Sequence, residues 1–253
     1  MTILCYHATE PGWQSPMSVE PADFDSHVRW LVRNRTVLPL SVAVGRLDRS
    51  GRLPSGSTAL TFDDGFNSVH EHAWPVLRRQ RVEATVFLVA ATLSPTGHPV
   101  DWVDTPPSYP LKTLNMDQVM EMQAAGVDFQ SHSNAHVDLT TLGFDECVRD
   151  LRDSREALES VVGRAVTMLA YPRGRHNEGV RRAAERAGFR FAFSLPERRE
   201  PPGPFSIPRV GIHRGNSLLN LRIKSRREYL PMRTSFGYAA MRAVRQQSRR
   251  WAR

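Results

Sequence analysis

Apolar segments of strand length alternate with helix-like segments along this chain, and this alternation constrains its fold more than any other feature. Residues 84–91 form an apolar run typical of a strand covered on both faces. Residues 144–162 carry apolar side chains at helical spacing, and Gly163 ends that stretch. The same order continues with a strand at 166–170, a helix that Asn177 caps and Gly188 ends, and a strand at 189–193. This pattern predicts parallel strands with outer helices in one α/β domain, and 253 residues suffice for its core.

Two short motifs, about seventy residues apart, carry most of the chemical information. The first is Thr61-Phe62-Asp63-Asp64-Gly65, at the end of a predicted strand at 57–62. The second is His132-Ser133-Asn134-Ala135-His136, which follows a predicted strand at 127–131. Each motif alone has a simpler interpretation: the first as a solvated turn, and the second as two histidines that lie four residues apart by chance. Together they offer two carboxylates and two imidazoles, enough for one divalent metal ion and one free base, and they favour a mononuclear metal hydrolase.

Both motifs lie where a strand breaks off, and this position lets nearby side chains reach one pocket. Adjacent residues in a strand point to opposite faces, so Asp63 and Asp64 can share a pocket only in a turn. Residues four apart in a helical turn lie on one face, so His132 and His136 can converge on one ion. Two neutral imidazoles and one carboxylate suit Zn, Co, Ni or Fe(II) and leave positions open for water and substrate.

Four further segments accompany these two motifs along the chain. They are Cys5-Tyr6-His7, residues 122–127, Ala170-Tyr171-Pro172-Arg173-Gly174 and Pro208-Arg209-Val210. From residue 1 to about residue 214 the chain therefore resembles the polysaccharide deacetylases of carbohydrate esterase family four, the NodB-homology family. The pair Tyr6-His7 and the segment from Ala170 to Gly174 resemble the branch that deacetylates poly-N-acetylglucosamine.

The resemblance implies a fold, a reaction and a set of roles. The fold is a distorted (β/α)7-type barrel with its site at the carboxyl ends of the strands, formed here by residues 1–223. The reaction is metal-dependent hydrolysis of N-acetyl groups on an amino-sugar polysaccharide or its precursor, with a metal-bound water as nucleophile. One divalent ion is implied, with Zn favoured over Co, Ni or Fe. The implied roles are general base for Asp63, metal ligands for Asp64, His132 and His136, proton donor for His7, and oxyanion binding by the backbone amide at Tyr171.

Two departures from the family pattern leave roles open. Much of the family has an arginine at the position of Ala170, where it orients the base. Arg173 or Arg209 would have to replace it here, and we favour Arg209. A late leucine-x-x-histidine motif also lacks a clean match, although His213 lies near its place. The proton donor is therefore His7, with His213 as the alternative.

Several other features have a structural interpretation beside the functional one. His70 and His72 lie on a predicted helix at 69–80, where solvated or capping roles are expected. Residues 93–115 and 196–204 are predicted loops, and Trp102 and Tyr109 in the first could stack on a sugar ring or simply pack. The only two cysteines, Cys5 and Cys147, do not form a disulfide framework.

Basic residues are concentrated at the carboxyl-terminal end. The net charge is +8, and residues 224–253 hold nine basic residues and one acidic residue, so residues 1–223 are balanced. Residues 224–253 are therefore a predicted basic tail, with a helix at 235–252 that could lie on an anionic membrane surface. A docked helix and a frayed terminus are the alternatives. No nucleic-acid-binding motif accompanies the arginines, so nucleic acid is not an expected partner.

The first residues and the hydropathy pattern give an expectation about location. The chain opens without a basic start or an apolar core of signal-peptide length, and it contains no apolar run long enough to span a membrane. We therefore expect a cytoplasmic protein, either free or peripheral at the inner membrane face, with a lipid-linked glycan precursor among its candidate substrates. Two other functions remain open: deacylation or deformylation of a glycolipid or small N-acyl metabolite, and glycan binding without catalysis.

Overall fold

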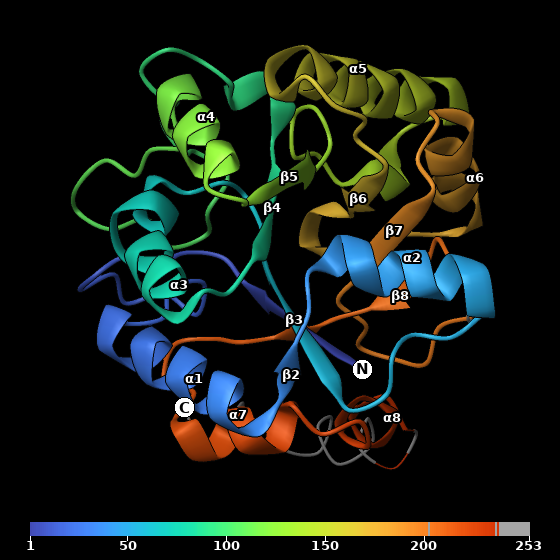
Figure 1. Cartoon of the computed structure of the whole chain (residues 1–253). Helices are drawn as coiled ribbons and strands as arrows, with labels where there is room; N and C mark the ends of the chain where they lie inside the picture. Colours follow the sequence, from blue (N-terminus) through green and yellow to red (C-terminus); the bar gives the residue numbers. More distant parts are fainter. Residues whose placement is uncertain (202, 236, 238–253) are drawn as a thin grey trace, which may run out of the picture.

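The computed structural model describes residues 1–201, 203–235 and 237. Its strands form one sheet and are all parallel to their neighbours (Figure 1). They are β1 (Thr2–Tyr6), β2 (Thr36–Val37), β3 (Ser57–Phe62), β4 (Ala84–Leu88), β5 (Asp128–Ser131), β6 (Met168–Ala170), β7 (Phe191–Ser194), β8 (Ile207–Pro208) and β9 (Val210–Gly211). The strand expected at 57–62 is confirmed without change, and those expected at 84–91, 166–170 and 189–193 differ at their ends by one to three residues.

The sheet curls until its two ends meet, and Arg209 lies at this junction. The strand order is β8-β7-β6-β5-β4-β3-β1-β9, with β2 paired to β3 outside this path. The two terminal strands, β8 and β9, flank Arg209 in the sequence. The backbone N–H of Arg209 donates to the carbonyl of Ser194 at 3.0 Å. The result is a nearly closed parallel barrel, and it confirms the predicted single-domain, distorted (β/α)7-type fold.

Helices surround the barrel. They are α1 (Pro21–Asn34), α2 (Leu40–Ser50), α3 (Trp74–Gln80), α4 (Met116–Ala124), α5 (Phe144–Val162), α6 (Glu178–Arg186), α7 (Leu218–Lys224) and α8 (Tyr229–Arg233), with single helical turns η1 (Val69–Ala73), η2 (Ala90–Thr92), η3 (Leu139–Thr141) and η4 (Pro172–Gly174). α5 has the predicted bounds, and Gly163 ends it in the left-handed conformation. Asn177 caps α6 as expected, because its side chain accepts from the Val180 N–H. The helix predicted at 69–80 is a π-helical turn that continues into α3.

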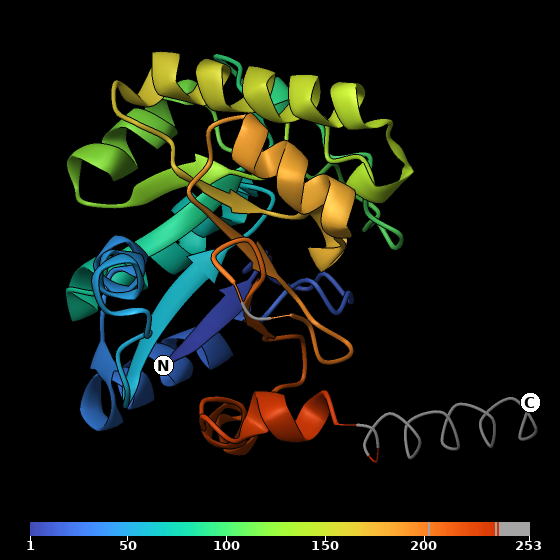
Figure 2. The ribbon, with the colours of Figure 1, turned by 90° about the vertical axis from the view of Figure 1, so that its right-hand side faces the viewer.

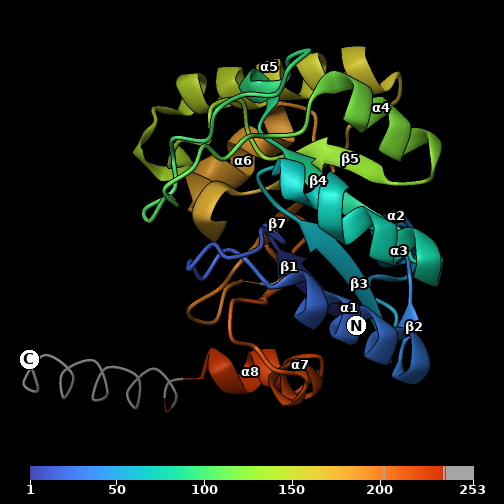
Figure 3. The same ribbon diagram turned by 90° about the vertical axis from the view of Figure 1, so that its left-hand side faces the viewer.

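The barrel interior is apolar at one end and polar at the other. Phe87 of β4 and Phe193 of β7 belong to strands that are not neighbours, yet their ring centroids lie 5.6 Å apart across the interior. Leu40 and Val44 of α2 join the same buried cluster, and Figure 1 shows α2 lying across this amino-terminal end of the barrel. Figure 3 shows β3 and β5 pointing to one side, where the segment between β4 and α4 lies. Polar side chains that face inward are therefore gathered at the carboxyl ends.

The last described residues pack on the outside of the barrel. Leu221 of α7 is fully buried, and Tyr229 and Leu230 of α8 pack against the core. The first part of the predicted basic tail thus belongs to helices of the domain. Apart from Ser235 and Gly237, the helix predicted at 235–252 lies outside the described residues. Among the described residues, no helix is both long and apolar enough to cross a membrane.

Candidate active site

A tight turn at the end of β3 brings two consecutive carboxylates into one pocket. Asp63 still follows the strand, and its N–H donates to the carbonyl of Tyr6 at 3.0 Å. Asp64 and Gly65 then both have φ of +67°. A Cβ on Gly65 would lie 2.5 Å from a terminal methyl of Leu88, and this contact together with the left-handed backbone favours glycine at this position. The left-handed backbone at Asp64 turns its side chain to the same side as that of Asp63, and both are almost completely buried.

The histidine motif also leaves its strand through left-handed residues. Ser133 and His136 have φ of +68° and +54°. The N–H of His136 donates to the hydroxyl of Ser133 at 3.0 Å, which stabilises the turn. Non-glycine residues in this conformation are uncommon and concentrate at functional sites. With Asp64, they place three such residues within the two motifs that the sequence singled out.

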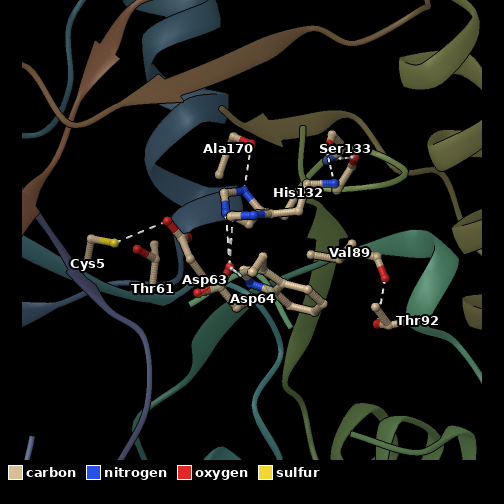
Figure 4. A network of polar contacts seen from close by, with 12 residues as sticks. Cys5, Thr61, Asp63, Asp64, Val89, Thr92, His132, Ser133 and Ala170 are labelled. Carbon is tan, nitrogen blue, oxygen red and sulfur yellow. Dashed lines mark hydrogen bonds and ion pairs between the residues drawn. The ribbon is translucent and has the colours of Figure 1, made fainter. Parts of the chain in front are cut away.

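Asp64, His132 and His136 converge as a group that can hold a metal ion. Oδ1 of Asp64 lies 3.1 Å from Nε2 of His136 and 3.5 Å from Nε2 of His132. Nδ1 of His132 donates to the carbonyl of Ala170 at 2.8 Å, so its Nε2 is free to bind a metal (Figure 4). Burial, partly opposed by Asp63, lowers the pKa of His132 to about 4. His132 is therefore neutral at pH 7, as a metal ligand must be.

Two buried polar atoms in this group lack a hydrogen-bond partner. They are Oδ2 of Asp64 and Nδ1 of His136. Unpaired buried polar atoms are costly, so a bound species that coordinates Asp64 would relieve part of this cost. Two imidazole nitrogens and one carboxylate within 4.8 Å of one another form the donor set that Zn, Co, Ni and Fe(II) accept. The residues therefore fit a divalent transition metal.

Asp63 is held by a separate set of partners. Arg209 donates to both of its carboxylate oxygens, each at 2.7 Å, and also to Oγ1 of Thr61 at 3.1 Å. The thiol of Cys5 donates to Oδ2 of Asp63 at 3.3 Å, as Figure 4 shows. Burial alone would raise the pKa of Asp63, but Arg209 and His132 outweigh it and hold that pKa well below its usual range. Asp63 is thus an ionised carboxylate with a fixed orientation.

The structure distinguishes between the two arginines that were candidates to replace the family's arginine at the position of Ala170. Arg209 contacts Asp63, whereas Arg173 lies 3.8 Å from Asp104 in an exposed ion pair. Ala170 contributes its carbonyl to His132. The arginine beside Asp63 therefore comes from the junction of β8 and β9.

The two candidate proton donors have different surroundings. His7 lies within 4.8 Å of the acceptor and donor atoms of Cys5 and Asp63, and its Nδ1 is buried without a hydrogen-bond partner. His213 lies further along the same side, close to Lys224. Burial, followed by the charge of Lys224, lowers the pKa of His213 to about 4. At neutral pH, His213 is therefore a neutral imidazole, whose remaining N–H is far too weak an acid to protonate a leaving amine.

The structure contradicts the expectation that the backbone amide of Tyr171 binds the oxyanion. Its backbone N–H donates to the carbonyl of Phe193 at 3.0 Å, as part of the pairing between β6 and β7. The side chain is fully buried, and its hydroxyl donates to the carbonyl of Phe205 at 2.9 Å. With its amide hydrogen already engaged, Tyr171 has a structural role in the sheet.

Two residues near the site make contacts that the sequence did not predict. Trp102 donates its indole N–H to Oδ1 of Asp64 at 3.3 Å, and its ring lies 5.3 Å from that of His136. Cys5 lies on β1 two residues before His7, which directly follows the strand, so the alternation of a strand places both on one side, and this alternation was the available signal. Tyr109 donates to the carbonyl of Pro11, and His70 pairs with Glu121 at the surface.

The fold and the site together define a class, the single-domain α/β-barrel hydrolases with a carboxylate and histidine cluster at the carboxyl ends of the strands. Within this class, the chain belongs to the polysaccharide deacetylase family, because the sequence profile of that family matches residues 50–192.

Individual relatives extend the likeness over most of the chain. The YxkH protein of Bacillus subtilis is 25% identical over 225 residues, which are 86% of this chain and 73% of YxkH. The poly-β-1,6-N-acetyl-D-glucosamine N-deacetylase of Staphylococcus aureus is 24% identical over 204 residues, 76% of this chain and 67% of the enzyme.

Solved structures share the fold. The Streptococcus pyogenes deacetylase PplD in complex with acetate aligns with a TM-score of 0.74 at 24% identity, covering 89% of this chain and 98% of PplD. IcaB from Ammonifex degensii aligns with a TM-score of 0.67 at 22% identity, covering 87% of this chain and 94% of IcaB.

Proposed function

We propose that this protein is a metal-dependent N-deacetylase that acts on an amino-sugar polysaccharide or its precursor. One observation carries the proposal: a buried, oriented carboxylate, Asp63, stands beside a separate ligand group of Asp64, His132 and His136. This arrangement keeps the base free while the neighbouring residues hold the metal, and both belong to a barrel of the polysaccharide deacetylase family.

The residues divide the chemistry of amide hydrolysis among them. When bound by Asp64, His132 and His136, a divalent ion would polarise the amide carbonyl and lower the pKa of the attacking water. Asp63 accepts the proton of that water, and Arg209 fixes the carboxylate in the orientation it needs. His7 donates a proton to the leaving nitrogen. His7 is favoured over His213 because it lies beside Asp63 and because His213 is neutral at pH 7.

The proposed substrate class rests on the relatives. The Staphylococcus aureus enzyme is named for poly-β-1,6-N-acetyl-D-glucosamine and matches 76% of this chain. An N-acetylglucosamine polymer is accordingly the first substrate to test. Zinc is the first metal to test, since its tetrahedral sites combine imidazole and carboxylate ligands with an open position.

Location and membrane contact form a separate part of the proposal. The balance of charge in residues 1–223 and the excess of basic residues in 224–253 support a cytoplasmic protein held at an anionic membrane surface. A lipid-linked glycan precursor would then be an accessible substrate. Fractionation of the full chain and of a chain ending at residue 234 tests this part, and equal recovery of both in the soluble fraction would remove it.

Acetate release tests the central proposal. Protein stripped of metal and reloaded with Zn, Co or Ni would be assayed on N-acetylglucosamine oligomers beside Asp63→Asn. We expect release that depends on metal and is at least about 100-fold lower in the variant. Tight metal binding without acetate release from these oligomers would favour a glycolipid or small N-acyl substrate. Failure to bind any of the three metals would instead favour a glycan-binding protein without catalysis.

A further inference from the structure

A cavity of about 800 Å³ adjoins the candidate active site. It lies between the turn after β6, the segment after β7, and helices α7 and α8. Figure 2 shows the orange segment after β7 between the gold turn η4 and the red helices. Val210, Gly211 and His213 line this cavity, and Val210 directly follows Arg209, whose guanidinium holds Asp63. A substrate bound at Asp63 could therefore extend into the cavity.

Positive charge dominates the cavity wall. Five basic side chains line it, from Arg173, Arg175, Arg198, Lys224 and Arg233, against the two carboxylates Glu197 and Glu200. We call this space the cationic cavity. A wall of this composition, next to a site that handles neutral acetamido sugars, is not required by the deacetylation chemistry.

The carboxylates in the wall already have partners. Glu200 accepts a hydrogen bond from Ser194 at 2.5 Å and lies 3.3 Å from Nε2 of His176. Glu197 interacts electrostatically with Arg175, and Arg175 also pairs with Asp138 at 2.8 Å. Both carboxylates and two of the five cations thus have local partners, because Arg173 also pairs with Asp104 at 3.8 Å.

Within the part of the chain that the structure describes, two of the remaining cations donate hydrogen bonds to neutral oxygens only. Nζ of Lys224 donates to the carbonyl of Gly211 at 2.8 Å and to Oδ1 of Asn216 at 2.7 Å. Nη1 of Arg233 donates to the carbonyl of Pro196 at 2.8 Å. These contacts orient the two side chains without neutralising them. Burial and the nearby charge of Arg233 lower the pKa of Lys224 to about 8, as expected where cations crowd together without an anion between them.

We propose that the cationic cavity binds an anionic group, a phosphate or a carboxylate, carried by the glycan substrate next to the sugar that is deacetylated. This inference rests on the proposed deacetylase function and narrows its substrate class. Arginine and lysine together suit such a group, because guanidinium binds oxyanions in a bidentate manner and ammonium adds a point charge. A neutral homopolymer of N-acetylglucosamine would leave these charges unpaired.

Three trisaccharides of N-acetylglucosamine test the inference on the metal-loaded full chain. One is neutral, one carries a phosphate monoester on its reducing-end sugar, and one has a uronic acid in that place. We expect kcat/KM to be at least about 10-fold higher for one anionic compound than for the neutral one, which is about 1.4 kcal/mol. Whether the phosphate or the carboxylate compound is preferred identifies the source of the anion. Equal values for all three would overturn the inference while leaving the deacetylase function intact.

Variants locate the effect in the cavity. Lys224→Met and the surface variant Arg198→Gln should each reduce the preference for the anionic compound about 3- to 10-fold, mainly through KM. Arg227→Gln is the matched control, because Arg227 is highly exposed, pairs with Glu228 and does not line the cavity. A preference that survives in both cavity variants would place the anion elsewhere.

A binding measurement separates this inference from the catalytic proposal. Inorganic phosphate would be titrated into chelator-treated protein, so that a metal ion cannot bind it. Binding that Lys224→Met weakens, in a protein that releases acetate from none of the trisaccharides, would retain the cavity and reject the deacetylase function. Absence of phosphate binding together with equal turnover of all three compounds would reject the cavity alone.

Discussion

Nη1 and Nη2 of Arg209 each donate a hydrogen bond of 2.7 Å to one carboxylate oxygen of Asp63, although the two residues lie 146 positions apart in the sequence. Both side chains are almost completely excluded from solvent, with 0% and 2% of their surface exposed. A buried ion pair is stabilising only when its geometry is good and its other donors and acceptors are satisfied. Thr61 and Cys5 add hydrogen bonds to this pair, whereas Nε of Arg209 is buried without a partner, so the network is connected around Asp63 but one donor of Arg209 is left unsatisfied.

Replacing Arg209 should affect stability and catalysis through the same contact. Arg209→Met leaves Asp63 buried without its counter-charge, and we expect a loss of about 3–5 kcal/mol in the free energy of unfolding, measured with urea. Without the positive charge the pKa of Asp63 rises. Because the base acts only when ionised, the acidic limb of the kcat profile then shifts to higher pH. Arg209→Lys retains the charge but not the bidentate geometry, so its shift should be smaller. Unchanged pH profiles in both variants would show that Asp63 is not the titrating base.

Trp102 should influence metal affinity through its hydrogen bond to Asp64. Trp102→Phe removes the indole N–H but retains a ring beside His136. Loss of a hydrogen bond to a metal ligand typically weakens binding 10- to 100-fold, and the 3.3 Å distance suggests the lower end, about 10-fold. Calorimetric titration with zinc measures this change, and Trp74→Phe provides a control with the same substitution away from the site. Equal affinities in wild type and Trp102→Phe would limit Trp102 to packing.

Cys5 should resist alkylation although it lies within the site. It is fully buried, and burial, which the charge of Arg209 opposes and Asp63 reinforces, raises the pKa of its thiol well above the usual value. The thiolate is the reactive form, so little of it is present at pH 8. We expect iodoacetamide to label Cys5 in urea but not in native protein over the same time, as measured by mass spectrometry. Labelling of native protein at the rate of a free thiol would mean that the barrel end opens readily.

His213 should make the stability of the metal-free protein depend on pH. Its pKa is about 4 in the folded state and about 6.5 in the unfolded chain, so the unfolded state binds more protons between these values. Stability should therefore fall as the pH decreases from about 6.5 to about 4, by at most about 1.4 kcal/mol per pH unit for this group. His213→Gln should reduce the slope of unfolding free energy against pH in this window, whereas His72→Gln controls for loss of a partly exposed imidazole. A slope that His213→Gln leaves unchanged would contradict the assigned burial.

Much of the fold could be predicted because its signals are local. The helix at 144–162 has a complete apolar stripe and a glycine at its end, and the strand at 57–62 is bounded by glycines. The ends of these strands were less predictable, because apolar residues continue after the last paired residue of β4 and Phe189 precedes the first paired residue of β7. The very short strands β8 and β9 have no periodicity to detect, and only pairing with β7 and β1 defines them.

Some residues of the site could likewise be predicted from local patterns, whereas others depend on long-range contacts. Asp64, His132 and His136 could be grouped from motif spacing, and the structure brings them together. The neighbourhood of Trp102 depends on how a long loop folds over the barrel, which no local pattern determines. The hydrogen bond of the Tyr171 amide could not be predicted, because it depends on pairing with Phe193 of the next strand.

The position of Arg209 at the junction of the sheet also has a consequence for protein synthesis. During translation the chain emerges from its amino terminus, so Asp63 is exposed on the growing chain long before the residue that must hold it. The β8–β9 segment arrives last among the strands and completes both the circle of hydrogen bonds and the charge balance around Asp63. A nascent chain that stops before this segment can contain Asp64, His132 and His136 and still lack the arginine that orients Asp63, so the proposed activity would begin only after the last strands of the barrel have been made.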